Sequence, residues 1–306
     1  MRQAAFLSVV LSVGFLPALA SGQEIGDKIV VTAEKAQLRT RNDTTGTVPK
    51  GAILVVKNGS GDWFWVAYSG NAGTVKGWIN RSDVIPLSQA LDFFNEELRG
   101  NPTSWAYAGR GMIWDEKGEH DSAISDYNEA IRLDPTGSDA YRDRGLAWEQ
   151  KGDYDKAISD YNEAIRRNPK DARSYFGLGN IWTAKGEYDK AVSNLSEAIR
   201  IDPKFADPWN GRAWLAATCP DTKYRNGTKA VADATKAYEL NGGKSSNDLD
   251  TLGAAYAEAG DFQTAVKWQE KAVELAPADK RFAYQSRLDL YKAHKPYREE
   301  VNRQQN

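Results

Sequence analysis

A ten-residue segment that recurs at a fixed spacing is the feature of this sequence that most limits its possible folds. Residues 123–132 recur unchanged as residues 157–166, 34 residues later, and recur in altered form as residues 191–200. Glycine and proline keep the same step, in the sets Gly111, Gly145, Gly179 and Pro135, Pro169, Pro203. A period of 34 residues is typical of stacked helical units and argues against a single closed globule.

The residue types at these offsets are those that a pair of antiparallel helices needs. Gly145 and Ala157 are small where two paired helices come closest, and Tyr161 fills space between helices. Gly152 can adopt the left-handed conformation that ends the first helix. Pro169 ends the second helix, because proline lacks an N–H and restrains the residue before it. One pair cannot bury its own apolar face, so the stability of such an array comes from stacking.

Glycine, alanine, aromatic residues and proline at these offsets resemble the tetratricopeptide repeat (TPR) family. The resemblance implies an all-α solenoid over residues 104–279 that binds a protein or peptide in its concave groove. We predict five repeats, at 104–137, 138–171, 172–205, 206–245 and 246–279. In the fourth repeat, residues 218–227 lengthen the loop between the two helices.

A helix is expected at each end of the array. Residues 88–101 form an amphipathic pattern that predicts a linking and capping helix. Residues 280–306 are predicted to hold a closing helix and a loose tail, with Phe282, Leu288 and Tyr291 facing inward. These additions bring the expected total to about twelve helices.

The first twenty residues have the pattern of an export signal. Arg2 precedes an apolar run over residues 4–15, and Ala18-Leu19-Ala20 fits the small-x-small cleavage pattern. We therefore predict a signal peptide at 1–20 and an exported protein, periplasmic or extracellular, of a bacterial envelope. An uncleaved membrane anchor is the alternative interpretation. Cys219 is the single cysteine, so no internal disulfide can form.

Residues 25–86 are rich in β-branched residues separated by glycine-containing turns, which predicts several short strands. The order and spacing of five segments resemble the bacterial SH3-type domain. These segments are Leu38-Arg39, Gly46-Thr47-Val48-Pro49-Lys50-Gly51, Gly61-Asp62-Trp63, Gly77-Trp78-Ile79 and Ser82-Asp83-Val84. The resemblance implies a small all-β SH3-like barrel before the solenoid, hence a multidomain chain.

Aromatic residues cluster in one predicted strand of this module. Strand alternation puts Trp63 and Trp65 on one face, and Phe64 and Val66 on the other. One face must form the core of a domain this small. Trp63, Trp65 and Tyr68 are the candidate ligand residues, and relatives that bind cell-wall peptides suggest peptidoglycan as the ligand. The alternative is that most of these rings are core.

The TPR resemblance also implies where a partner would bind, namely on the first helix of each repeat, at its second, fifth, ninth and twelfth positions. The candidate groove residues are Trp105, Met112, Asp139, Arg142, Arg173, Phe176, Asn180, Asn210 and Trp214. Arg142 and Arg173 are candidates to meet an acidic or carboxylate group of the partner. A solvated charged surface is the alternative interpretation of the same residues.

The composition argues against most kinds of chemistry. Metal centres and nucleophilic sites draw on histidine and cysteine, and the chain has two histidines and one cysteine. The net charge of −2 and the absence of long Lys or Arg runs argue against nucleic acid as a partner. We predict an exported scaffold that is not an enzyme and has no cofactor or metal. The alternative function is envelope targeting, with peptidoglycan held by the barrel.

Overall fold

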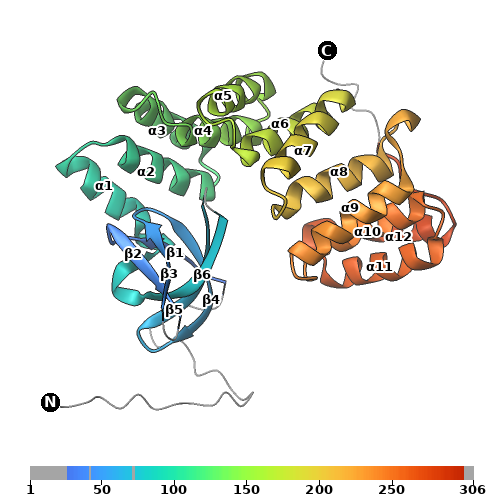
Figure 1. Cartoon of the computed structure of the whole chain (residues 1–306), viewed down its shortest axis with the longest axis horizontal. Helices are drawn as coiled ribbons and strands as arrows, with labels where there is room; N and C mark the ends of the chain where they lie inside the picture. Colours follow the sequence, from blue (N-terminus) through green and yellow to red (C-terminus); the bar gives the residue numbers. More distant parts are fainter. Residues whose placement is uncertain (1–25, 41–42, 71–72, 300–306) are drawn as a thin grey trace. The chain divides into compact units, whose positions relative to one another are not determined.

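A computed structural model describes residues 26–40, 43–70 and 73–299. The predicted signal peptide lies outside these residues. The chain divides into two compact units, one ending at Ile113 and the other beginning at Trp114 (Figure 1).

The N-terminal unit contains one antiparallel sheet in the strand order β3-β2-β6-β5-β4-β1-β7. The strands are β1 (Lys28–Val31), β2 (Lys35–Arg39), β3 (Thr44–Pro49), β4 (Ile53–Ser60), β5 (Trp63–Gly70), β6 (Gly73–Asn80) and β7 (Val84–Pro86). Short 3₁₀ turns, η1 (Arg81–Asp83) and η2 (Leu87–Gln89), flank β7. The succession of short strands agrees with the β-rich pattern of the sequence.

The sheet is not closed into a barrel, which differs from the expected SH3-like barrel. Among the described residues, β3 pairs only with β2, and β7 pairs only with β1. β7 has three residues and ends at Pro86, which has no N–H to donate to a further strand. The SH3 resemblance itself therefore stays a prediction, and the structure gives a seven-stranded antiparallel sheet.

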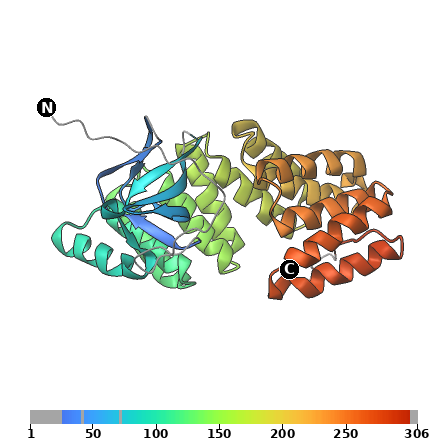
Figure 2. The ribbon, with the colours of Figure 1, turned by 90° about the horizontal axis from the view of Figure 1, so that it is seen from below.

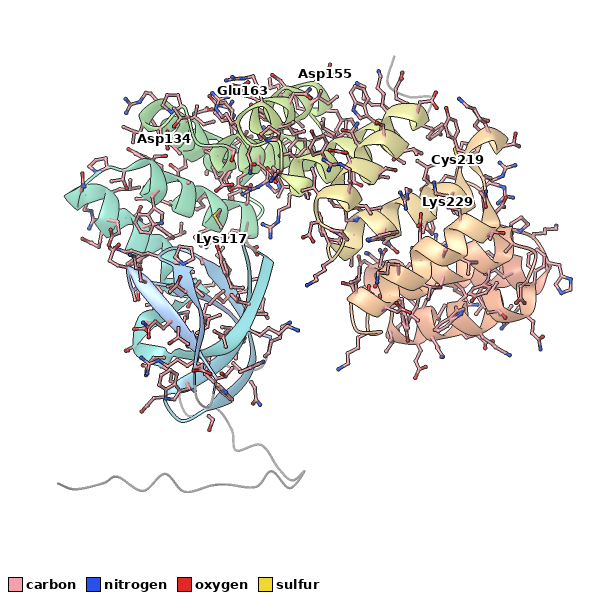
Figure 3. All side chains as sticks on the ribbon, viewed as in Figure 1. Lys117, Asp134, Asp155, Glu163, Cys219 and Lys229 are labelled. Carbon is pink, nitrogen blue, oxygen red and sulfur yellow. The ribbon has the colours of Figure 1, made fainter. Side chains whose placement is uncertain are left out.

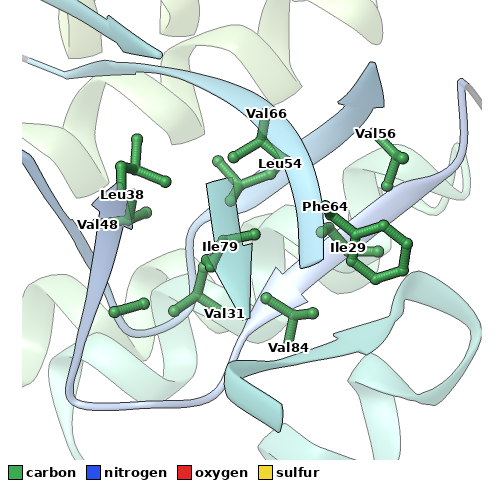
Figure 4. Packing of buried hydrophobic residues seen from close by; sticks show 11 residues of the cluster. Ile29, Val31, Leu38, Val48, Leu54, Val56, Phe64, Val66, Ile79 and Val84 are labelled. Atoms are coloured by element: carbon green, nitrogen blue, oxygen red, sulfur yellow. The ribbon is translucent and has the colours of Figure 1, made fainter. Parts of the chain in front are cut away.

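One face of the sheet forms the core of this unit (Figure 4). Phe64 and Val66 are buried there with Ile29 and Leu54, whereas Trp63 and Trp65 are only half-buried. The two-residue period of a strand separates the sets, as the sequence predicts.

Two helices pack against this sheet, α1 (Ala90–Gly100) and the start of α2 (Ser104–Glu116). Phe94 is buried against Val30, and the indole Nε1 of Trp105 donates to the carbonyl oxygen of Lys50 at 2.8 Å. The Lys50 ammonium lies 5.0 Å from the Trp105 ring centre and bonds to Glu97 at 3.0 Å. The first compact unit thus includes α1 and the part of α2 up to Ile113.

The C-terminal unit is a helical array in which consecutive helices pair and stack (Figures 1 and 2). Its helices after α2 are α3 (His120–Leu133), α4 (Asp139–Gln150), α5 (Tyr154–Arg167), α6 (Ala172–Ala184), α7 (Tyr188–Ile201), α8 (Ala206–Thr218), α9 (Gly227–Leu240), α10 (Ser246–Glu258), α11 (Phe262–Leu275) and α12 (Ala278–Lys292). The described residues thus hold twelve α-helices, as the repeat pattern predicts.

The residues singled out in the repeat act as the sequence predicts. Gly152 ends the turn after α4 with a φ of 80°, a left-handed conformation that glycine adopts without strain. Tyr161 is buried, and a Cβ on Gly145 would lie 3.0 Å from its ring. α5 ends at Arg167, two residues before Pro169.

The long loop of the fourth repeat contains a single 3₁₀ turn, η3 (Thr222–Tyr224). Cys219 lies at the end of α8 (Figure 3) and is buried, with its backbone oxygen accepting from Arg225 at 2.8 Å. The side chain of Asn226 caps α9 by accepting from the backbone N–H of Lys229 at 2.9 Å. Cys219 is therefore a small packed residue.

The closing helix differs from expectation at one position. Leu288 and Tyr291 are buried as predicted, but Phe282 is 84% exposed. The buried stripe of α12 runs through Tyr284, Leu288 and Tyr291, which are spaced by about one helical turn each. Phe282 precedes Tyr284 by two residues, or about 200° around the helix, and so points away from that stripe.

Two glycines of the fourth repeat, Gly227 on α9 and Gly211 on α8, test how closely the helices pack. Gly227→Ala should destabilise the protein by about 2 kcal/mol, because the new Cβ would lie 2.5 Å from the backbone nitrogen of Ala259. Gly211→Ala is the control, since its Cβ would meet neighbours at 3.5 Å or more and should stabilise by about 0.5 kcal/mol. Urea unfolding followed by circular dichroism measures both. Equal stabilities would contradict the packing described here.

Candidate functional site

A cavity of about 490 Å³ lies in the C-terminal unit, between the first helices of three consecutive repeats and the closing helix. α6, α8, α10 and α12 each contribute side chains to its wall. The lining includes Phe176, Asn180, Asp207, Asn210, Trp214, Asn247, Asp250, Thr251, Asp279, Lys280, Tyr284 and Arg287. Aromatic rings, amides and charged groups thus converge on one space, which is typical of a binding site.

A buried ion pair forms one wall of the cavity. Asp250 is only 3% exposed, and the Arg287 guanidinium donates to its two oxygens at 2.8 Å each. The amide of Gln269 donates to the same carboxylate at 2.7 Å. Burial raises the pKa of Asp250, and the contact with Arg287 acts in the opposite direction. The pair is therefore internally neutralised and holds α10 to α12.

Aromatic rings surround the same guanidinium. The carbon Cζ of Arg287 lies 5.3 Å from the ring centre of Trp214, 5.1 Å from that of Tyr284 and 5.2 Å from that of Tyr297. Cation–π contacts of this kind are worth about 0.5–2 kcal/mol. They hold the ring of Trp214 in place beside the cavity.

Asn210 has an unsatisfied side chain inside the cavity wall. The residue is 9% exposed, and among the described residues its Oδ1 has no hydrogen-bond partner. A buried polar atom without a partner costs about 1–3 kcal/mol, so its presence calls for an explanation. Asn210 contributes to the lining of the cavity, although its Oδ1 has almost no surface open to that space.

The charged groups that line the cavity are of both signs. Burial raises the pKa of the Asp207 carboxyl, and the nearby positive charge of Arg173 lowers it. Asp279 and Lys280 add one group of each sign from α12. The cavity is thus polar without a strong preference for anions.

Four of the nine residues predicted for the groove line this cavity together: Phe176, Asn180, Asn210 and Trp214. Arg173 does not line it but acts on Asp207 electrostatically.

Two further predicted groove residues, Asp139 and Arg142, belong to a separate charge cluster. Arg142 contacts three carboxylates, at 2.6 Å from Asp139, 2.8 Å from Asp143 and 3.7 Å from Asp171. Its charge is therefore already matched within the protein. The prediction that Arg142 meets a partner's carboxylate has no support in this arrangement.

The remaining two predicted groove residues, Trp105 and Met112, lie in the N-terminal unit. Trp105 packs against Phe93 and Phe94 of α1 and bonds to Lys50. Its ring is thus engaged with the β-sheet unit. Met112 is half-buried in α2.

Sequence reasoning missed the contribution of the fifth repeat and of α12. The second and fifth positions of the fifth repeat are Asn247 and Asp250, so the same offsets that give Asp207 and Asn210 could have found them. Lys280, Tyr284 and Arg287 follow the last repeat and carry no repeat signal. Their place in the cavity depends on how α12 packs.

The half-buried face of the β-sheet carries a second group of aromatic residues. Trp65 and Trp78 are paired across β5 and β6, with ring centres 5.4 Å apart. Arg39 lies over the Trp63 ring at 5.6 Å. Tyr68, the third predicted ligand residue, packs at the edge of the core, because strand alternation turns it to the same side as Phe64 and Val66.

Comparisons with known proteins agree with the helical architecture. The tetratricopeptide repeat family matches residues 115–169 and 143–204, and it matches again at residues 249–279. No curated protein matches the chain.

Solved structures show the same fold at low sequence identity. Yeast Tom70 has a TM-score of 0.53 at 21% identity, over 66% of this chain and 43% of that one. The Cut9–Hcn1 assembly of APC/C has a TM-score of 0.59 at 18% identity, over 66% and 39%. A thermophilic TPR protein of Thermus thermophilus has a TM-score of 0.50 at 20% identity, over 62% and 100%. The chain thus spans less than half the length of the first two proteins.

Matched repeats and a stacked helical array define the class of protein. The chain contains tetratricopeptide repeats, matched within residues 115–204 and 249–279, with an antiparallel β-sheet region on the N-terminal side of them. Proteins of this class are protein- or peptide-binding scaffolds and typically have no enzymatic activity. Within the described residues, no helix has the length and apolar character needed to cross a membrane.

The Asp250–Arg287 pair can be tested through its pH dependence. Arg287→Met should destabilise the protein by about 3 kcal/mol at pH 7.5, because it leaves a buried carboxylate without its cation. It should also raise the pKa of Asp250 further. A carboxyl whose pKa is higher in the folded chain contributes stability at low pH that is lost as the pH rises. The destabilisation should therefore shrink as the pH falls towards 4.5.

Urea unfolding at the two pH values measures this effect. Arg132→Met is a matched control, because Arg132 forms an exposed ion pair with Glu129 one helical turn away. A loss of stability by Arg287→Met that does not vary with pH would show that Asp250 is not the group affected.

Proposed function

We propose that this protein is an exported scaffold that binds an extended peptide segment of a partner protein in the cavity between α6, α8, α10 and α12. The observation that carries the proposal is the cavity itself, where aromatic rings, amides and charged groups from four helices converge. The backbone N–H and C=O groups of an extended peptide need hydrogen-bond partners, and the amide side chains of the cavity wall can supply them.

The chemistry of the cavity wall supports a peptide as the ligand. Asn180, Asn210 and Asn247 place three amides on consecutive first helices, and each amide can donate and accept hydrogen bonds. Phe176 and Trp214 add rings that can pack against a side chain of the peptide. The helices are held by packing before any ligand arrives, so little conformational entropy is lost on binding.

The reactive groups of the described chain are engaged in structure, which supports a role without catalysis. Burial raises the pKa of the Cys219 thiol and so disfavours the nucleophilic thiolate. His120 pairs with Asp115 at 3.0 Å, and His294 stacks on Phe262 with ring centres 5.2 Å apart. Among the described residues, neither histidine forms a hydrogen bond with Cys219.

Export is part of the proposal and rests on the pattern of residues 1–20. A second candidate function is targeting to the cell wall through the β-sheet unit. The observation that favours it is the pairing of Trp65 and Trp78 on the face opposite the core. Half-buried aromatic rings on a sheet can stack on a sugar or peptide.

Sedimentation with purified cell-wall sacculi tests this second candidate. The mature chain should sediment with the sacculi, and Trp65→Ala should reduce the bound fraction severalfold because it removes one ring of the pair. Phe282→Ala is the control, since Phe282 is equally aromatic and is exposed on α12. No sedimentation of the unmodified chain would end the wall-targeting proposal and leave the peptide-binding proposal standing.

Peptide selection tests the main proposal. Peptides selected from a random 12-residue display library on the full chain should bind in solution, measured by fluorescence anisotropy. Asn210→Ala should weaken this binding about tenfold, because it removes one or two hydrogen bonds worth about 1 kcal/mol each.

Asn194→Ala is the matched control, because Asn194 lies on α7 and bonds to its own helix at the carbonyl of Lys190. It should leave the affinity unchanged. Selected peptides that bind Asn210→Ala as tightly as the unmodified protein would place the peptide site elsewhere.

A further inference from the structure

The chain does not leave the array after α12. Residues 295–299 pass back to the C-terminal end of α8, where the backbone N–H of Glu299 donates to the carbonyl of Thr218 at 3.0 Å. The Arg298 guanidinium donates to the carbonyl of Ala217 at 3.2 Å. These carbonyls lie in the last turn of α8, where the helix itself provides no donors. The sequence predicts a loose segment here, yet the segment satisfies these acceptors.

Side chains of the same segment hold specific partners. The indole Nε1 of Trp214 donates to a carboxylate oxygen of Glu299 at 2.8 Å, and the ring of Tyr297 lies 5.9 Å from that of Trp214. Arg298 forms an ion pair with Glu258 of α10 at 2.5 Å. Three consecutive residues, aromatic, basic and acidic, thus each meet a matching group on the array.

The surface that binds residues 297–299 is continuous with the cavity between α6, α8, α10 and α12. Trp214 lines the cavity and also contacts both Tyr297 and Glu299. Arg287 lies against the rings of Trp214 and Tyr297 at nearly equal distances. Trp214 and Ala217 are also two of the first-helix positions at which the TPR resemblance places ligand contacts. The tail therefore occupies part of the surface on which a partner peptide is expected.

The contacts of the tail are ones that a separate peptide of the same sequence could also make. They include two bonds to backbone carbonyls, one bond from an indole, one ion pair, and contacts of the Tyr297 ring with Trp214 and Arg287. The side chain of Arg298 is one-third exposed, so its ion pair is partly hydrated. A segment held this way stays bound largely because its tether gives it a high local concentration, about millimolar for a short linker.

We propose that the surface formed by Trp214, Ala217, Thr218 and Glu258 recognises a peptide with an aromatic residue, an arginine and an acidic residue in succession. The chain's own residues 297–299 occupy this surface in the free protein, and a partner of the same chemistry displaces them. The inference rests on the proposed peptide-binding function, and it names the partner's chemistry and the self-contact that competes with it.

Binding of the tail sequence in trans tests the proposal. The probe is a fluorescent peptide with the sequence of residues 293–299, titrated with the full chain and followed by anisotropy. The double variant Tyr297→Ala/Arg298→Ala weakens the contacts of the chain's own residues 297–299 with α8 and α10. It should therefore bind the probe about tenfold more tightly than the unmodified protein, because the tethered segment competes less well.

Lys295→Ala is the matched control, because it also removes one positive charge from the tail. The Lys295 side chain is exposed and has no hydrogen bond or ion pair to α8 among the described residues. It should bind the probe as weakly as the unmodified protein. Equal probe affinity in the double variant and the unmodified protein would overturn the proposal, as would no binding to the double variant at millimolar peptide.

A second pair of variants separates this inference from the proposed function. In the double-variant background, Glu258→Gln should weaken the probe severalfold because it removes the ion pair to the arginine, whereas Asn210→Ala should not. Library peptides that bind the cavity equally in the unmodified protein and the double variant would leave the proposed function intact and overturn the role of the tail. Library peptides that bind neither protein would instead count against the proposed function.

Discussion

The close approach of paired helices is the contact on which the rest of this structure depends. Small residues make it possible: a Cβ on Gly145 would lie 3.0 Å from the Tyr161 ring, and one on Gly177 would lie 2.4 Å from it. A single tyrosine thus packs against its own partner helix and the first helix of the next repeat. Because one pair cannot bury both faces of that ring, each repeat depends on its neighbours for stability.

Stacking also decides where polar groups can be useful. First helices of successive repeats lie side by side, so residues at matching offsets on α6, α8 and α10 meet around one cavity. The array tolerates the unsatisfied Oδ1 of Asn210 there, while it pairs Asp250 fully with Arg287 and Gln269. The two groups differ because the carboxylate of Asp250 has its partners within the protein, whereas the Oδ1 of Asn210 has none among the described residues.

Candidate site residues could be named from the repeat offsets, but their partners could not. Phe176, Asn180, Asn210 and Trp214 were found this way, and they share one cavity. Arg142 was named by the same rule, yet three carboxylates surround it, because side chains from two neighbouring helices converge on it. The position of a residue within its repeat predicts the face of the helix on which it lies. It does not predict which side chains of neighbouring helices contact that face.

The sequence by itself determined the helical array, its period, the turns at glycine and proline, and the inward face of β5, because these follow from local geometry that repeats along the chain. Only the tertiary structure decided three other features. The sheet stays open at β3 and β7, α12 supplies Arg287 to the cavity, and residues 297–299 return to α8. Each of these depends on contacts between segments far apart in sequence, which no local pattern records.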